Sequence, residues 1–237
     1  MDDVNHFIYV DDPYWLDEAF TDAISTMDTG ILDRNLRYVA RISLLLETSR
    51  HPFHSGVDLG GGYGLFVRGM RDKGFDFYWS DKYAENLAAR GFEAKEGSSY
   101  DVAVAIEVLE HIPNPAVFIS DCKKKYDFKT LFFSAECFDP AKVPEKDWWY
   151  WTFESGQHIS FFSELTLNQI AAMNDMRLFD FGYGLYAMSS HDLSFDAGFR
   201  GRLRRKFINS CRFGSHSRKS FMVSDMHLMR QRFRSNG

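Results

Sequence analysis

The chain has 237 residues, and its 45% hydrophobic content, with 23 Phe, 11 Tyr and 5 Trp, suffices for one fully packed domain. No stretch approaches the roughly 18 uninterrupted apolar residues of a membrane-spanning helix. The acidic N-terminus lacks the basic start and apolar run of a secretory signal. The three cysteines have no metal-site spacing and are typical of reduced thiols. We therefore expect a globular, cytoplasmic protein.

The net charge of −5 is unevenly distributed along the chain. From Arg200 to Gly237 there are eleven Lys and Arg and one acid, Asp225, so this segment carries +10 and the remainder −15. We expect a main domain over 1–199, with a helical lead-in over 1–50, and a basic extension over 200–237. Three partners fit the extension: the acidic body itself, an anionic membrane surface, or nucleic acid. Nucleic acid is the least favoured, because the aromatic and basic residues do not follow the pattern of an RNA-binding module.

The first half of the chain alternates helical and extended patterns. A short helix is expected near 15–25, and apolar spacing predicts a longer one over about 32–48, ending before Pro52. A strand over 55–59 leads into a glycine-rich turn and a helix to about 73. Further strands are expected over 75–81, briefly over 91–95 and over 101–106, with a short helix over 83–90.

The second half continues the alternation. We expect a helical turn over 107–111, a helix over 116–124, a strand over 130–135 and an irregular aromatic segment over 139–162. Ser163 is positioned to cap a helix over 164–176, and strands over 178–181 and 185–188 flank two glycines. The pattern predicts an α/β fold with a doubly wound, mostly parallel sheet, whose ligand crevice lies at the carboxyl ends of the strands.

The glycine-rich turn is Val57-Asp58-Leu59-Gly60-Gly61-Gly62-Tyr63-Gly64. Glycine permits positive φ and close approach of a ligand to the backbone, although a tight turn without any ligand has the same composition. Asp58, Asp81 and Glu107 each follow or end a predicted strand. Their carboxylates should therefore converge at one edge of the sheet.

This series of motifs resembles the class I S-adenosylmethionine-dependent methyltransferases over about 32–181. It is most similar to the branch that includes the ubiquinone-pathway O-methyltransferases. The aromatic segment over 148–162 and the start over 13–16 resemble, more loosely, methyltransferases of bacterial polysaccharide clusters. The resemblance implies a Rossmann-like sheet of seven strands and S-adenosylmethionine as cofactor. It also implies the cofactor-binding residues, which are Asp58 for the methionine ammonium, Asp81 for the ribose, Lys82, Glu107, and the turn residues Gly60, Gly61, Gly62 and Gly64. The adenine contacts have no clear counterpart in the sequence.

Glu107, Glu110 and His111 would share one face of a regular helical turn. Carboxylates with an imidazole suit Mg²⁺ or Mn²⁺. The pattern resembles a divalent-metal site in ubiquinone-pathway O-methyltransferases and in small-RNA terminal 2′-O-methyltransferases. In the RNA enzymes a histidine from a later segment completes the set, and His158 stands in a comparable place here. The alternative is that Glu107 only touches the cofactor, Glu110 is a solvated acid, and His111 is a cap or a metal-free base.

The acceptor side of the crevice is expected to hold the catalytic groups. His111 and His158 are the candidate bases for an acceptor hydroxyl. Trp15, Trp149 and Tyr150 are the candidate acceptor contacts, since aromatic faces stack on sugars, although these rings could equally pack the loop onto the sheet. The interpretation is a methyltransferase for O-methylation of a sugar, glycan or other small hydroxylated acceptor. The alternatives are a metal-dependent RNA or phenolic O-methyltransferase and a catalytically silent cofactor-binding module.

Overall fold

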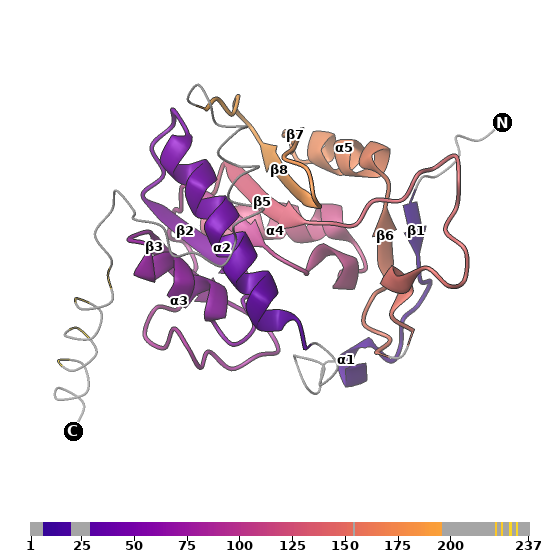
Figure 1. Ribbon diagram of the computed structural model, residues 1–237, viewed down its shortest axis with the longest axis horizontal. Coiled ribbons are helices and arrows are strands. Elements are labelled where there is room, and N and C mark those ends of the chain that lie inside the picture. Colours follow the sequence, from indigo (N-terminus) through magenta and orange to yellow (C-terminus); the bar gives the residue numbers. More distant parts are fainter. Residues whose placement is uncertain are drawn as a thin grey trace.

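The computed structural model describes residues 7–19, 29–153 and 155–195, together with Phe221, Ser224, Leu228 and Gln231. Two sheets are present in the described residues (Figure 1): six strands in the order β3-β2-β4-β5-β8-β7, and a separate pair, β1-β6. The strands are β1 (Phe7–Tyr9), β2 (Ser55–Leu59), β3 (Asp76–Ser80), β4 (Val102–Ala105), β5 (Thr130–Ser134), β6 (Ser160–Phe162), β7 (Arg177–Asp180) and β8 (Leu185–Ser189). The α-helices are α1 (Leu16–Ala19), α2 (Ile31–Thr48), α3 (Leu65–Asp72), α4 (Pro115–Tyr126) and α5 (Glu164–Met173), and short 3₁₀ helices are η1 (Leu109–His111) and η2 (Trp149–Trp151).

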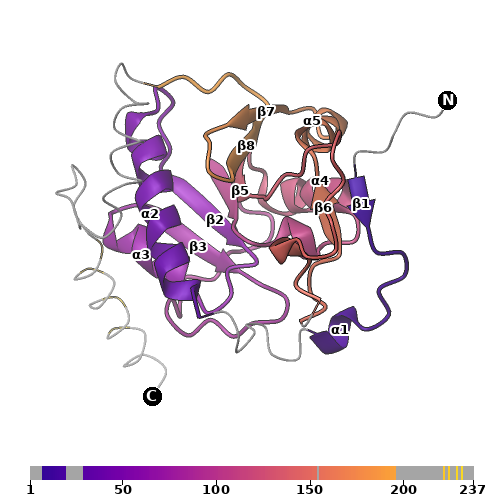
Figure 2. The same ribbon diagram turned by 45° about the vertical axis from the view of Figure 1, so that its right-hand side comes forward.

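The six-stranded sheet is covered by helices on both faces, as Figures 1 and 2 show. Strands β3, β2, β4 and β5 are parallel. Strand β8 runs antiparallel to both of its neighbours, β5 and β7. Alternate residues of β4 pack to opposite sides: Val102 and Val104 join the core under α2 and α3, whereas Ala103 and Ala105 join the core under α4 and α5. This confirms the doubly wound, mostly parallel α/β fold expected from the sequence.

Several element predictions are confirmed closely. The helix expected over 32–48 is α2, and β2 and β5 begin where predicted. Ser163 caps α5, because its Oγ accepts the backbone N–H of Thr166 at 3.2 Å. The predicted strands near the C-terminal end of the domain are β7 and β8.

Two element predictions are wrong, both in the connection between β3 and β4. The strand expected over 91–95 is a single bridge between Glu93 and Trp79, so the main sheet has six strands rather than seven within the described chain. The helix expected over 83–90 is an irregular loop. The Asn86 side chain organises this loop, accepting the N–H of Ala89 and donating to the Ala89 carbonyl, and these local bonds compete with a helical ladder.

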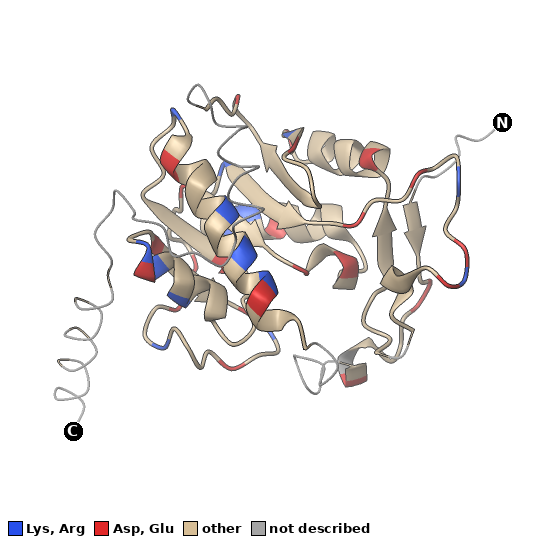
Figure 3. Ribbon diagram, in the orientation of Figure 1, with Lys and Arg blue, Asp and Glu red and all other residues tan. Residues whose placement is uncertain are grey.

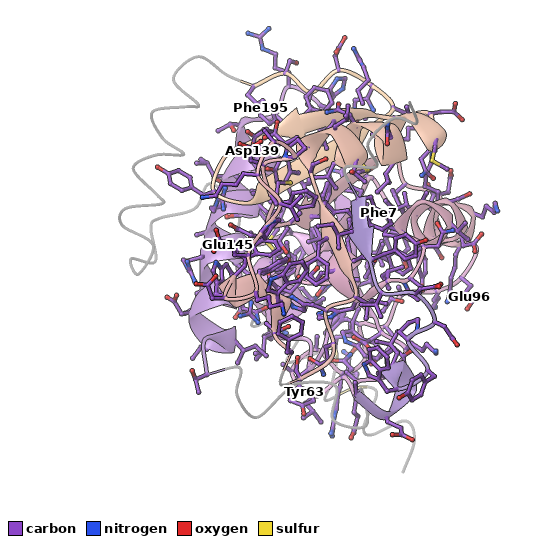
Figure 4. All side chains as sticks on the ribbon, turned by 90° about the vertical axis from the view of Figure 1, so that its right-hand side faces the viewer. Phe7, Tyr63, Glu96, Asp139, Glu145 and Phe195 are labelled. Carbon is purple, nitrogen blue, oxygen red and sulfur yellow. The ribbon has the colours of Figure 1, made fainter. Side chains whose placement is uncertain are left out.

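The β1-β6 pair was not expected from the sequence. It joins the N-terminal lead-in to the irregular segment over 139–162 through an antiparallel register that sets Phe7 opposite Phe162. Figure 4 looks onto this pair, with Phe7 near the middle, Tyr63 of the glycine turn at one end of the molecule and Phe195 at the other. The pair therefore lies beside the main sheet as a separate wall.

Most of the basic extension and much of the predicted helix over 15–25 lie outside the described residues. Within the extension, Phe221 contacts the domain: its N–H donates to the Arg71 carbonyl at 3.1 Å, and its ring lies 5.2 Å from the Arg71 guanidinium. In the described part of the chain, no helix has the length and hydropathy needed to cross a membrane.

Candidate active site

A cleft of about 1270 Å³ opens at the carboxyl ends of β2, β3 and β4. Asp58, Asp81 and Glu107 all line it, which confirms that these three acids converge. The remaining walls come from α2, from the residues around α1 and from the aromatic segment that precedes β6. The cleft is therefore closed by parts of the chain that are far apart in sequence.

The glycine turn forms one wall through its lack of side chains. Gly60 has φ of +69°, and a Cβ there would lie 2.7 Å from Cγ2 of Val108. The N–H groups of the turn are already used: those of Gly60 and Gly61 donate to the Ser80 carbonyl, and that of Gly62 donates to Asp81. A ligand can therefore approach the backbone of the turn closely, but these three N–H groups are not free to donate to it.

Asp58 is a buried carboxylate with unmet hydrogen-bonding capacity. It is only 3% exposed, and its Oδ2 has no hydrogen-bond partner among the described residues. Burial raises the pKa of Asp58, and the charge of Asp81 raises it further. A buried acid of this kind, at the edge of a cleft, suits a cationic ligand group such as an ammonium.

Asp81 fixes the loop that follows β3. Its Oδ2 accepts the N–H of Gly62 at 2.9 Å, and its Oδ1 accepts those of Tyr83 and Ala84 at 2.7 and 2.8 Å. Two carboxylate oxygens provide about four acceptor positions, so a ligand hydroxyl can still be accepted. Lys82 also lines the cleft, and its Nζ donates to the Tyr83 hydroxyl.

Glu107 lies two residues after the end of β4 in a left-handed backbone conformation, with φ of 55°. Its Oε1 accepts the Ser134 hydroxyl at 2.8 Å, and its Oε2 lies 3.8 Å from Nε of Arg34 on α2. Burial raises the pKa of Glu107 to about 6, with a contribution from the charge of Glu110. Sequence reasoning missed Arg34, whose only signal was its place among the basic positions of α2 (blue in Figure 3).

Glu110, His111 and His158 form a second cluster. One ligand atom from each lies within 4.8 Å of the others. The Nδ1 of His111 is 2.9 Å from the Gln157 carbonyl, and the Nδ1 of His158 is 2.8 Å from the Tyr150 carbonyl. Each carbonyl can only accept, so each Nδ1 carries the proton and each Nε2 carries the lone pair.

Glu110 is fully buried, and Tyr150 links it to the histidines of the cluster. Its Oε1 accepts the Tyr150 hydroxyl at 3.0 Å, whereas its Oε2 has no hydrogen-bond partner among the described residues. Burial raises the pKa of Glu110 to about 7. Burial also lowers the pKa of His158 to about 4, with a further contribution from His111, so His158 is neutral at neutral pH.

A family model described as a methyltransferase domain matches residues 31–179, which include the glycine turn, Asp81 and the Glu110 cluster. This chain is a class I S-adenosylmethionine-dependent methyltransferase. S-adenosylmethionine is its cofactor. The buried Asp58 and the open backbone at Gly60 fit the amino-acid portion of that molecule.

The methyltransferase is similar over a short stretch to curated ubiquinone biosynthesis O-methyltransferases. It is 44% identical over 39 residues to the protein of Paraburkholderia phytofirmans and 45% identical over 40 residues to that of Burkholderia vietnamiensis. The chain spans 17% of the length of each of these relatives.

Solved structures with a similar fold include two methyltransferases. The magnesium protoporphyrin IX methyltransferase of Synechocystis PCC 6803 is 15% identical, with 76% of this chain and 96% of that chain covered and a TM-score of 0.43. A methyltransferase in complex with the Haloferax volcanii Trm112 activator is 12% identical, with 76% and 97% covered and a TM-score of 0.49.

The methyltransferase departs from three of the sequence-based site predictions. Glu107 does not join the cluster of potential metal ligands, because its left-handed backbone breaks the regular helical turn assumed for 107–111. Gly64 does not line the cleft; it is the residue before α3, and its positive φ serves the turn. Trp15 lines a second, adjoining cavity instead of the cleft.

The structure places the other two predicted aromatic contacts at the cleft, and their side chains differ in exposure. Trp149 lines it and is 69% exposed. Tyr150 also lines it but is buried, with its hydroxyl directed to Glu110. Tyr150 therefore positions Glu110 through its side chain and His158 through its carbonyl.

Proposed function

We propose that this methyltransferase transfers the methyl group to a hydroxyl of a sugar, glycan or other small acceptor. The observation that carries the proposal is the pair His111 and His158. Both imidazoles line the cleft that holds Asp58, and both are oriented through Nδ1 by backbone carbonyls. A neutral imidazole with its Nε2 lone pair in a cofactor cleft is suited to accept a hydroxyl proton.

The cofactor, when bound, supplies an electrophilic methyl group on a positively charged sulfur. The protein residues bind and orient it. Asp58 would accept hydrogen bonds from the methionine ammonium, and Asp81 would accept them from the ribose hydroxyls. The Arg34 guanidinium, beside Glu107, is placed to pair with the methionine carboxylate.

His158 is the proposed base. The acceptor oxygen would displace the cofactor sulfur at the methyl carbon, so that the carbon–sulfur bond breaks and S-adenosylhomocysteine leaves. The hydroxyl proton would pass to Nε2 of His158, while the Tyr150 carbonyl would stabilise the resulting positive charge through Nδ1–H. His111, whose ring centroid lies 4.9 Å from that of His158, orients the same hydroxyl.

The chemistry of the Glu110 cluster also fits a divalent metal. One buried carboxylate oxygen without a partner and two imidazole Nε2 atoms make a mixed oxygen and nitrogen ligand set for Mg²⁺ or Mn²⁺. Glu110, His111 and His158 would hold the ion, which would lower the pKa of an acceptor hydroxyl. This arrangement favours, as a second candidate, a metal-dependent phenolic or RNA O-methyltransferase.

Metal removal separates the two schemes. After EDTA treatment and gel filtration, the histidine-base scheme predicts unchanged methyl transfer, whereas the metal scheme predicts loss of activity and recovery with Mg²⁺ or Mn²⁺. Glu110→Gln should abolish any metal recovery but leave cofactor affinity unchanged. Isothermal titration with Mn²⁺ provides a readout that does not require an acceptor.

The function itself is tested with methyl-labelled S-adenosylmethionine and fractionated glycans or whole-cell extract. We expect label in a product whose methyl group is stable to mild base, as for an ether and unlike an ester. His158→Ala should reduce turnover by about 100-fold or more, the usual contribution of a general base, without changing cofactor affinity. Cofactor binding without transfer in any fraction would instead favour a catalytically silent module.

The basic extension is proposed to bind an anionic membrane surface, with nucleic acid the less favoured partner. Its +10 charge is the basis for this proposal. Co-sedimentation with anionic vesicles, lost at high salt and compared with oligonucleotide binding under the same conditions, tests it.

A further inference from the structure

A second cavity, of about 550 Å³, adjoins the catalytic cleft. His158 and Ser155 line both spaces, so the imidazole proposed as the base forms part of the wall between them. One side of the cavity comes from the lead-in after β1, and the other from the aromatic segment before β6. The cavity therefore exists only because these two segments pack together.

The two sides are held by specific hydrogen bonds. Nε1 of Trp15 donates to the Gly156 carbonyl at 3.0 Å, and the N–H of Val10 donates to the Ile159 carbonyl at 2.8 Å. These bonds fix the width of the cavity independently of any ligand. The cavity is consequently a formed feature of the fold.

The walls are mainly aromatic. Trp151 lies 4.5 Å from Phe161 and is stacked on Phe153 at 5.9 Å, measured between ring centroids. Phe153 is 70% exposed, which is costly for a phenyl ring unless something covers it. The wall residues with the largest apolar surfaces are Tyr9, Val10, Trp15, Trp151, Phe153 and Phe161.

Two of the polar groups along these walls already have partners within the same segment. Nε1 of Trp151 donates to the Glu145 carbonyl, and the Ser155 hydroxyl donates to the Thr152 carbonyl. The other polar side chains of the walls are Tyr9, Lys146 and His158. They offer a sugar few replacements for its hydrogen bonds to water, whereas an aryl ring or hydrocarbon chain would lose none.

We propose that this cavity binds an apolar aryl or hydrocarbon part of the acceptor, while the acceptor hydroxyl reaches His158 in the cleft. The inference rests on the proposed function and narrows it to amphiphilic acceptors. The hydroxyl-bearing part and the apolar part would lie on either side of the His158 imidazole. Because the cavity and the cleft share this wall, one acceptor that spans both explains them more simply than two unrelated ligands would.

The test uses the neutral apolar fluorophore N-phenyl-1-naphthylamine with the full-length protein. We expect one saturable site. Val10→Trp, which fills the cavity, and Phe153→Ala, which removes an exposed wall ring, should each weaken binding by about tenfold. Trp149→Ala is the matched control, because Trp149 is equally exposed in the same segment but lines only the cleft. Its affinity for the fluorophore should stay at the wild-type value.

Two further measurements complete the test. The ring proton resonances of His158, assigned with His158→Gln, should shift when the fluorophore saturates the site. Affinity for S-adenosylhomocysteine, measured by titration calorimetry, should be the same in all variants and thus report that they are folded.

The outcomes are distinguishable. Unchanged fluorophore affinity in both Val10→Trp and Phe153→Ala, or a His158 resonance that does not move, would overturn the inference. Wild-type protein that binds S-adenosylhomocysteine but transfers no methyl group to any hydroxylated acceptor would instead refute the proposed function.

Discussion

At the scale of single residues, the site depends on carboxylates that the fold keeps away from water. Asp58 and Glu110 are buried, each with one oxygen that has no hydrogen-bond partner among the described residues. Such groups destabilise a folded protein unless a ligand compensates them. Their burial therefore supports the binding roles proposed above, which are a cofactor ammonium at Asp58 and a proton or metal ion at Glu110.

Cofactor affinity should depend on pH through Glu107. The pKa of Glu107 is raised from 4.5 to about 6, so its side chain is mainly protonated at pH 5 and mainly ionised at pH 7. Binding of the cationic cofactor should therefore strengthen as pH rises through about 6, by up to about tenfold between pH 5 and 7. The dissociation constant of the cofactor, measured by calorimetry from pH 5 to pH 7, tests this expectation.

Glu107→Gln should bind with an affinity that changes less than that of the wild type between pH 5 and 7, because Asp58, whose pKa is also raised, is then the remaining titrating acid beside the ammonium. Glu136→Gln is a matched control, because the pKa of Glu136 is also raised but its side chain does not line the cleft. An unchanged pH dependence in Glu107→Gln would contradict the role given to Glu107.

Tyr150→Phe tests the positioning of Glu110. The substitution removes the hydroxyl that donates to Glu110 at 3.0 Å and leaves a buried carboxylate without that bond. We expect a loss of about 1–3 kcal/mol in the free energy of unfolding at pH 8, where Glu110 is mostly ionised. Because the pKa of Glu110 is about 7, the loss should shrink at pH 5, where the group is protonated. Equal losses of unfolding free energy at pH 8 and pH 5, measured by urea denaturation, would argue against this role.

At the scale of elements, α2 is the part of the lead-in that reaches the cofactor side of the cleft. Its buried face, including Val39 and Ile42, packs against α3 and the sheet. This packing carries Arg34 to within 3.8 Å of Glu107, whereas Arg37 pairs with Asp33 one turn away on the same helix. Two neighbouring arginines on one helix therefore have different environments.

This difference gives a matched pair of variants. Arg34→Met should weaken S-adenosylhomocysteine binding by about tenfold, the usual cost of losing a charge-assisted contact with a carboxylate, or about 1.4 kcal/mol. Arg37→Met should bind like the wild type, because the Arg37–Asp33 pair is largely exposed. Equal effects in calorimetry would show that Arg34 acts through general charge alone.

At the scale of the whole molecule, the cleft joins the sheet to a wall that the sheet does not form. The carboxyl ends of β2, β3 and β4 provide the cofactor side, and the β1-β6 pair carries the aromatic segment of the acceptor side. A ligand bound between them contacts both parts, so it should stabilise the complete fold.

Asp58→Asn separates stability from binding. We expect S-adenosylhomocysteine at 100 times its Kd to stabilise the wild type by about 2.7 kcal/mol. The isosteric amide removes a buried carboxylate whose pKa is raised, so the ligand-free variant should melt at or above the wild-type temperature at pH 8. Its stabilisation by the same ligand concentration should be smaller. A lower melting temperature without ligand would contradict the account of Asp58 as an unsatisfied buried acid.

The sequence by itself determined the cofactor side of the methyltransferase. Asp58, the glycine turn, Asp81 and Glu107 follow consecutive strands, and parallel strands necessarily bring their carboxyl ends to one edge. Apolar spacing and helix-capping preferences also predicted α2 and the Ser163 cap. They failed over 81–100, where side-chain bonds from Asn86 replaced the expected helix.

Only the tertiary structure decided the acceptor side. His111 and His158 meet because the Ile159 N–H donates to the Glu110 carbonyl at 2.8 Å and so fixes the aromatic segment beside η1. The positive φ of Glu107 removes it from that cluster, and Trp15 faces a second cavity because it bonds to Gly156. Contacts between residues 141 positions apart have no local pattern in the sequence, since they depend on how separate elements pack.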